Sequence, residues 1–131
     1  MTEVQIRDAG VKNWETNLAK LKTWTQDRWD AWASIHPDEH ESAYEKRQLL
    51  SMSGENDVPC IFGNRGHCAY CENYSCEECP LYDIKESDRD TGIDCCYAWD
   101  KVFQDFIAEP YTLEAAIKSF ENMLKYIQEN G

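Results

Sequence analysis

The stretch Thr112-Leu-Glu-Ala-Ala-Ile-Lys-Ser-Phe-Glu-Asn-Met-Leu-Lys-Tyr-Ile127 predicts a helix more clearly than any other part of the chain. Thr112 is a suitable N-cap, and Glu114 favours the positive end of the helix dipole. The apolar residues recur at intervals of three and four, which places them on one side of an α-helix. They are Leu113, Ala116, Ile117, Phe120, Met123, Leu124 and Ile127. This stretch indicates an α-helical protein.

Helical spacing is present in three other parts of the chain. Apolar residues in the range 11–35 predict one helix, which Pro37 ends. A second helix is expected over residues 38–52, with Ser53-Gly54 at its end and an acidic first turn made of Asp38, Glu39 and Glu41. A further helix is expected from Cys95 or Cys96 to Pro110, and its apolar face would carry Trp99, Val102, Phe103, Phe106 and Ile107. We expect all five tryptophans to lie in the core.

These elements predict a mainly α fold with about four helices and an inserted, irregular, cysteine-rich metal-binding knuckle. The 131 residues are one domain's length, so we expect a single domain over 1–131. Within it, residues 11–53 would form a helical hairpin, 54–94 the cysteine-rich loop and knuckle, and 95–131 two C-terminal helices. The sequence has no apolar run long enough for a secretory signal or a membrane span. We therefore expect a cytoplasmic protein that does not contact a membrane.

Two closely spaced CxxC pairs predict a metal site in the middle of the chain, at Cys68-Ala-Tyr-Cys71-Glu-Asn-Tyr-Ser-Cys76-Glu-Glu-Cys79-Pro80. A CxxC turn can direct two thiolates at one ion, and two such turns can complete a tetrahedral four-thiolate shell. Our first hypothesis is a structural Zn²⁺ bound by Cys68, Cys71, Cys76 and Cys79, with Cys95 as the reserve ligand. The ion would hold an irregular loop against the helices, since zinc binding contributes directly to folding free energy.

Other interpretations of the cysteines stay open. An iron–sulfur cluster also takes four thiolates, although the spacing matches neither common ferredoxin pattern. Thiol redox chemistry is disfavoured because the neighbouring carboxylates, Glu72, Glu77 and Glu78, oppose thiolate formation. Cys60 and His67 could complete a second site with Cys95 or Cys96, or at least one of these thiols could simply be a buried small side chain.

A second motif is His36-Pro-Asp-Glu39-His40, which has the H-x-x-E-H form of an inverted zinc-protease signature. In that signature the two histidines lie on one helix, and Pro37 belongs at a helix start, so His36 would precede the helix. We interpret the match as accidental. The chain also lacks a glycine-rich phosphate loop and the GxSxG motif. An enzyme is therefore the less favoured class.

Charge is concentrated around the cysteines. The chain has a net charge of −12, and residues 72–100 contain nine acidic residues against only Lys85 and Arg89. Such a surface repels nucleic-acid phosphates, so direct nucleic-acid binding is disfavoured and a protein partner with a basic surface is expected. The predicted interaction surface consists of Glu72, Glu77, Glu78, Asp83, Glu86, Asp88 and Asp90.

With its cysteine spacing, Cys79-Pro80-Leu81 and an amphipathic C-terminal helix, the chain resembles small cysteine-rich proteins of tailed bacteriophages. The resemblance implies the cytoplasm of a bacterial host and, because small acidic phage proteins frequently block host proteins, an inhibitory role. We therefore expect a binding or inhibitory module that acts on a basic surface of a host protein, such as one that handles nucleic acid or serves in defence. The alternatives are an iron–sulfur or redox-sensing protein, or a zinc-dependent enzyme.

Overall fold

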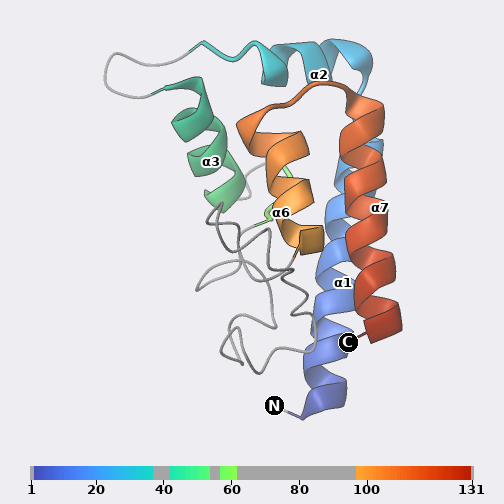
Figure 1. Ribbon diagram of the computed structural model, residues 1–131. Helices are drawn as coiled ribbons and strands as arrows, with labels where there is room; N and C mark the ends of the chain where they lie inside the picture. Colours follow the sequence, from blue (N-terminus) through green and yellow to red (C-terminus); the bar gives the residue numbers. More distant parts are fainter. Residues whose placement is uncertain (1, 37–41, 54–56, 62–96, 131) are drawn as a thin grey trace.

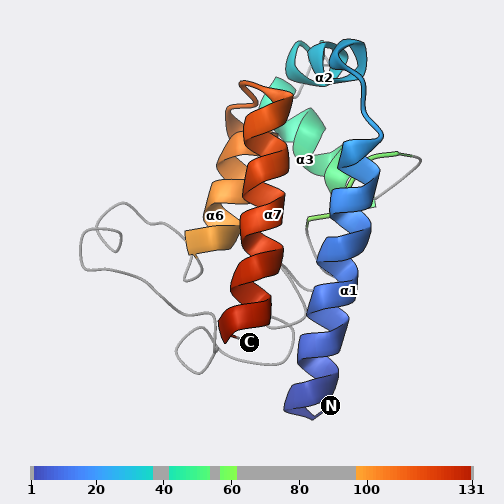
Figure 2. The ribbon, with the colours of Figure 1, turned by 90° about the vertical axis from the view of Figure 1, so that its right-hand side faces the viewer.

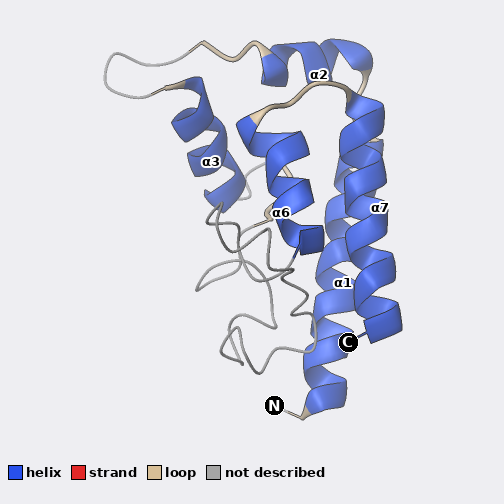
Figure 3. Cartoon of the chain, in the orientation of Figure 1, coloured by secondary structure: helices blue, strands red, loops and turns tan. Residues whose placement is uncertain are grey.

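The structure, a computed structural model, describes residues 2–36, 42–53, 57–61 and 97–130. This part of the chain is mainly α-helical and contains no strand, which confirms the predicted fold class (Figure 3). Its elements are α1 (Glu3–Lys22), α2 (Gln26–Ala33), α3 (Ala43–Ser53), α6 (Tyr97–Phe103), the π-helical turn η1 (Gln104–Ala108) and α7 (Leu113–Asn130).

The two longest helices form the spine of the molecule. α1 and α7 lie side by side and run in opposite directions, so the N-terminus and the C-terminus are at the same end (Figure 1). The view turned by 90° places α6 on the other side of α7 from α1 (Figure 2). A hydrogen bond from Arg7 Nη2 to the Gln128 carbonyl oxygen, 2.8 Å long, joins the ends of α1 and α7.

The first helix begins earlier than its apolar pattern predicted. Thr2 is its N-cap: the hydroxyl accepts from the Gln5 N–H at 3.1 Å, and the Gln5 side chain accepts from the Thr2 N–H at 2.9 Å. This reciprocal pair is a capping box, which satisfies two N–H groups that the first turn leaves without partners. The signal was present in the sequence as Thr-x-x-Gln, directly ahead of the buried Ile6.

The prediction of one helix over 11–35 is wrong, because the chain breaks at Thr23–Thr25. Thr25 adopts an extended backbone conformation and its hydroxyl accepts from the Arg28 N–H at 3.1 Å, which starts α2. The intervals of three and four continue across the break, since Trp24, Trp29 and Trp32 are all buried by the turn and by α2. Periodicity alone therefore could not separate one helix from two.

The second predicted helix also starts later than expected. Ser42 precedes α3, and its hydroxyl accepts from the Glu45 N–H at 3.1 Å as an N-cap does. The acidic residues expected in the first turn are therefore not part of α3, and positions 37–41 lie outside the described residues. The end at Ser53 agrees with the prediction.

The two C-terminal helices follow the sequence pattern closely. The expected helix ahead of Pro110 is present as α6 followed by η1, whose widened last turn closes with a 2.8 Å bond from Glu109 N–H to the Gln104 carbonyl. Thr112 caps α7 through a 3.1 Å bond from the Ala115 N–H to its hydroxyl. On α7 the fully buried members of the predicted stripe are Ala116, Phe120, Met123 and Ile127.

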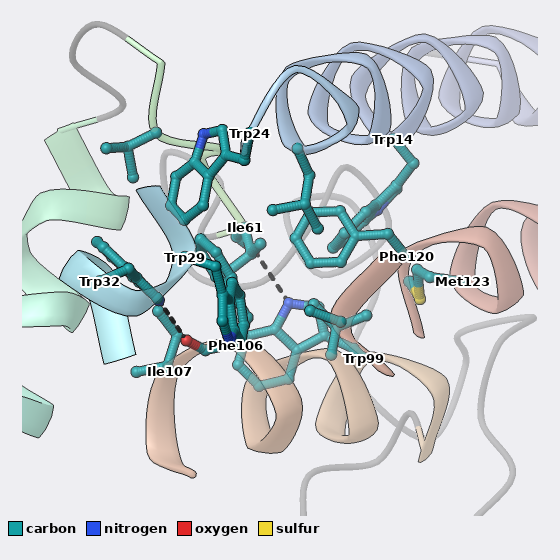
Figure 4. Packing of buried hydrophobic residues seen from close by; sticks show 14 of the residues in the cluster. Trp14, Trp24, Trp29, Trp32, Ile61, Trp99, Phe106, Ile107, Phe120 and Met123 are labelled. Carbon is teal, nitrogen blue, oxygen red and sulfur yellow. Dashed lines mark hydrogen bonds between the residues drawn. The ribbon is translucent and has the colours of Figure 1, made fainter. Parts of the chain in front are cut away.

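The core is rich in aromatic side chains, and all five tryptophans lie in it as predicted (Figure 4). Phe106 of η1 is at its centre: it stacks on Trp32 at 4.8 Å between ring centroids and meets Phe120 edge-on at 5.4 Å. α1, α2, α6, η1, α7 and the segment 57–61 all contribute buried residues to one cluster. This shared core fixes the position of the segment that leads into the cysteine-rich region.

Candidate functional site

The predicted site residues lie outside the residues that the structure describes. This applies to the metal ligands Cys68, Cys71, Cys76 and Cys79, to the reserve Cys95, and to the acidic surface formed by Glu72, Glu77, Glu78, Asp83, Glu86, Asp88 and Asp90. What the structure does describe is the part of the helical body from which this region begins and to which it returns. We call residues 57–61 and Trp99, together with the side chains that hold them, the base of the cysteine-rich region.

Asn17 pairs with the backbone of Cys60 in the base. Its Nδ2 donates to the Cys60 carbonyl at 2.8 Å, and its Oδ1 accepts from the Cys60 N–H at 3.1 Å. The amide thus satisfies both backbone groups of one residue, as a neighbouring strand would. Asn17 is only 2% exposed, so its amide is held away from water and both bonds contribute to the position of Cys60.

Ser51 of α3 holds the same segment from the other side. Its hydroxyl donates to the Pro59 carbonyl at 2.8 Å and accepts from the Ile61 N–H at 3.3 Å. Ser51 is fully buried, as is the Ile61 side chain, which enters the core. Asn17 and Ser51 therefore tie three consecutive residues to two helices that are distant from each other in the sequence.

Trp24 and Arg28 fix the beginning of the segment at Asp57. The Trp24 Nε1 donates to the Asp57 carbonyl at 2.9 Å, and the Asp57 carboxylate accepts two bonds from the Arg28 guanidinium at 3.0 and 3.3 Å. The Arg28 guanidinium also lies over the Trp24 ring, 4.2 Å from its centroid. The hydrogen bond from Arg28 lowers the pKa of Asp57 below its usual range, and burial opposes this only in part.

Trp99 closes the base. Its Nε1 donates to the Ile61 carbonyl at 3.0 Å, as the dashed line in Figure 4 shows. Ile61 is the last described residue before the cysteine-rich region, and Trp99 belongs to the first turn of α6 after it. One buried hydrogen bond thus holds the two ends of the intervening chain together. Joining the ends of about 35 residues costs roughly 3 kcal/mol or more of chain entropy, which the bonds of the base help to offset.

Sequence reasoning did not predict Asn17 and Ser51 as residues of this base. Asn17 falls within the apolar stripe of α1, between the buried Trp14 and Leu21, and we had assigned the neighbouring Leu18 to that stripe. A polar residue at a buried helical position was the available signal, since buried amides are nearly always hydrogen-bonded. Its partner could not be predicted, because Cys60 is 43 residues away along the chain.

The remaining candidates are described only in part. Cys60 is half-buried with its Sγ 3.7 Å from the Met52 carbonyl oxygen. His36 is exposed, whereas Glu39 and His40 of the H-x-x-E-H motif fall outside the described ranges. Within those ranges no three histidine, cysteine or acidic side chains group as a metal site would require. The metal prediction therefore rests on the sequence.

Two adjoining hollows follow α7 away from the base. The larger, about 640 Å³, extends from Gln26 along Leu113, Ile117 and Glu121, and the smaller, about 390 Å³, shares Glu121 with it and reaches Leu18. Acidic and lysine side chains both line them, so the hollows have no marked charge preference for a ligand. We therefore do not include them in the candidate site.

No protein-family model, curated protein or solved structure matches this chain. The functional argument consequently depends on the chemistry of the chain's own residues. Among the described helices, none combines the length and apolar character that crossing a membrane requires.

Proposed function

We propose that this chain is a small acidic metal-binding protein, and that it acts as a binding or inhibitory module against a basic surface of another protein. Its cysteine-rich region carries the metal, Zn²⁺ in our proposal, on Cys68, Cys71, Cys76 and Cys79. The same region presents the acidic interaction surface. By the resemblance of its cysteine spacing to phage proteins, the partner would be a host protein in the bacterial cytoplasm, such as one that handles nucleic acid or serves in defence.

The observation that carries the proposal is the hydrogen bond from Trp99 Nε1 to the Ile61 carbonyl, 3.0 Å long. Both residues are fully or nearly fully buried, so the two ends of the cysteine-rich region are attached to one rigid core. A region attached in this way pays less entropy on binding than a free segment would, because part of its freedom is already lost. A metal ion within the region would reduce this freedom further.

Charge supports a basic partner. The chain has a net charge of −12, and the cysteine-rich region contains most of the excess acid over base in its half of the sequence. Complementary charge raises the rate of encounter and selects among partners more than it raises affinity. Binding through this surface should therefore weaken as ionic strength rises.

Metal analysis of protein purified without added zinc tests the metal part of the proposal. We expect about one Zn²⁺ per chain, lost in the double variant Cys68→Ser with Cys71→Ser and kept in the matched control Cys60→Ser. A visible charge-transfer absorbance with bound iron would favour the iron–sulfur alternative. A folded wild-type protein with no stoichiometric metal would contradict the proposal.

Binding to proteins of a bacterial lysate tests the partner part. We expect one capture that salt disrupts and that is lost when Glu77, Glu78, Asp88 and Asp90 are changed to Lys. The control reverses four exposed acids of the helical body: Asp8, Glu15, Glu109 and Glu121. Because net charge changes equally in the two variants, the comparison separates a located surface from a general effect of charge. Equal loss in both variants, or capture insensitive to salt, would contradict the assigned surface.

A further inference from the structure

Arg47 of α3 is a buried cation whose contacts do not neutralise it. Its side chain faces η1, is 6% exposed as a residue, and donates one hydrogen bond, from Nε to the Ile107 carbonyl at 2.7 Å. Among the described residues no carboxylate forms an ion pair with it. The guanidinium has five N–H donors, so four on the two Nη atoms are left for another partner.

Burial without a counter-charge is costly for a guanidinium. Desolvation lowers the pKa of Arg47, and no neighbouring charge contributes to that shift. Charged groups in protein interiors are almost always paired, because an uncompensated buried charge destabilises the fold by several kcal/mol. An arginine that only needed to fill space would be replaced by methionine at no electrostatic cost.

The surroundings of Arg47 favour a small ligand that accepts hydrogen bonds. Trp32 of α2 donates from Nε1 to the Phe106 carbonyl at 2.8 Å, next to the carbonyl that Arg47 uses. The end of η1 is therefore held by one donor from α2 and one from α3, and the position of the guanidinium is fixed by this junction. π-helical turns such as η1 occur frequently at functional sites.

We propose that the Nη groups of Arg47 form a binding site for a small oxyanion of the carboxylate or phosphate class, at the junction of α2, α3 and η1. Two parallel N–H groups of a guanidinium match two oxygens of such an anion, and a charge-assisted pair of this kind is about twice as strong as a neutral hydrogen bond. The anion supplies the counter-charge that the described residues do not. This site is separate from the proposed metal and interaction surface.

Arg7 provides a matched control within the same chain. It also donates one hydrogen bond to a backbone carbonyl of another helix, from Nη2 to Gln128 at 2.8 Å, but it is exposed. Water and salt already compensate its charge, so a weak oxyanion gains little by binding there. A response at Arg47 without one at Arg7 therefore reports burial and not the presence of an arginine.

The test is a titration of the full chain with inorganic phosphate and, separately, with acetate, at constant ionic strength maintained by chloride. We expect saturable ¹H–¹⁵N shifts of the Arg47 Nε–H resonance with one or both anions, and only small linear shifts for Arg7. Preference for phosphate or for acetate identifies the class of ligand. At a concentration about ten times Kd, the bound anion should raise Tm by about 4 °C.

Two variants make the result decisive. Arg7→Met should keep the rise in Tm with the anion, whereas Arg47→Met should lose it and be at least as stable as the wild type without the anion. The proposal is overturned if Arg47→Met responds as the wild type does, or if neither anion shifts the Arg47 resonance in a saturable way. Should Arg47→Met fail to fold, the wild-type titration alone decides.

Discussion

Replacement of Asn17 by alanine should destabilise the protein by removing the main anchor of the cysteine-rich region. The Asn17 amide satisfies both backbone groups of Cys60, through bonds of 2.8 and 3.1 Å, from a side chain that is 2% exposed. In Asn17→Ala a backbone donor and a backbone acceptor lose their partners at once. Neither can be replaced by a neighbouring helix, because helical N–H and carbonyl groups are already paired within each helix.

The expected loss follows from the two bonds. Leaving a buried polar group without a partner costs about 1–3 kcal/mol, so two groups that are partly reachable by water should cost about 2–4 kcal/mol together. Alanine is the better helix former by roughly 0.5 kcal/mol, which works in the opposite direction. The matched control is Asn13→Ala, one turn earlier on α1, which has the same propensity gain and no hydrogen bond from its side chain among the described residues.

Urea unfolding followed by far-UV circular dichroism measures both variants. We expect the free energy of unfolding of Asn17→Ala to lie about 2–4 kcal/mol below that of Asn13→Ala. Asn17→Asp adds a sign test: its carboxylate would oppose the Cys60 carbonyl, so burial and this contact should raise its pKa, and stability should recover as pH falls through that raised value. A difference below about 0.5 kcal/mol between the two alanine variants would refute the anchoring role.

Three further outcomes are expected in urea unfolding. Trp99→Phe should cost about 1–3 kcal/mol more than Trp14→Phe, because only the Trp99 Nε1 has a hydrogen-bond partner among the described residues; equal losses would contradict this. Thr112→Ala should cost about 1 kcal/mol through loss of the α7 cap, and an unchanged midpoint would exclude that cap. Because the pKa of Asp57 is lowered, the stabilisation from its pair with Arg28 is present above the unfolded pKa and disappears as pH falls through the folded one; Asp57→Asn should remove this acid dependence, by about 0.2–1 kcal/mol for such an exposed pair.

The expected elements were predicted best where the physical signal is local. The stripe of α7 and its cap at Thr112 depend on residues within one or two turns, and both were found as expected. The break at Thr23–Thr25 was missed, since its signal is the N-cap Thr25 within a stripe that continues across it. A capping signal changes the path of the chain without changing which tryptophans are buried.

The sequence by itself determined that the protein is mainly helical, acidic and equipped with two CxxC pairs, because spacing, charge and composition are properties of neighbouring residues. Only the tertiary structure decided that Asn17, Ser51 and Trp99 hold the two ends of the cysteine-rich region, and that Arg47 is buried without a counter-charge. Such hydrogen bonds and burial join groups that lie tens of residues apart along the chain. No local pattern specifies the partner of a buried polar group, since that partner depends on how the helices pack.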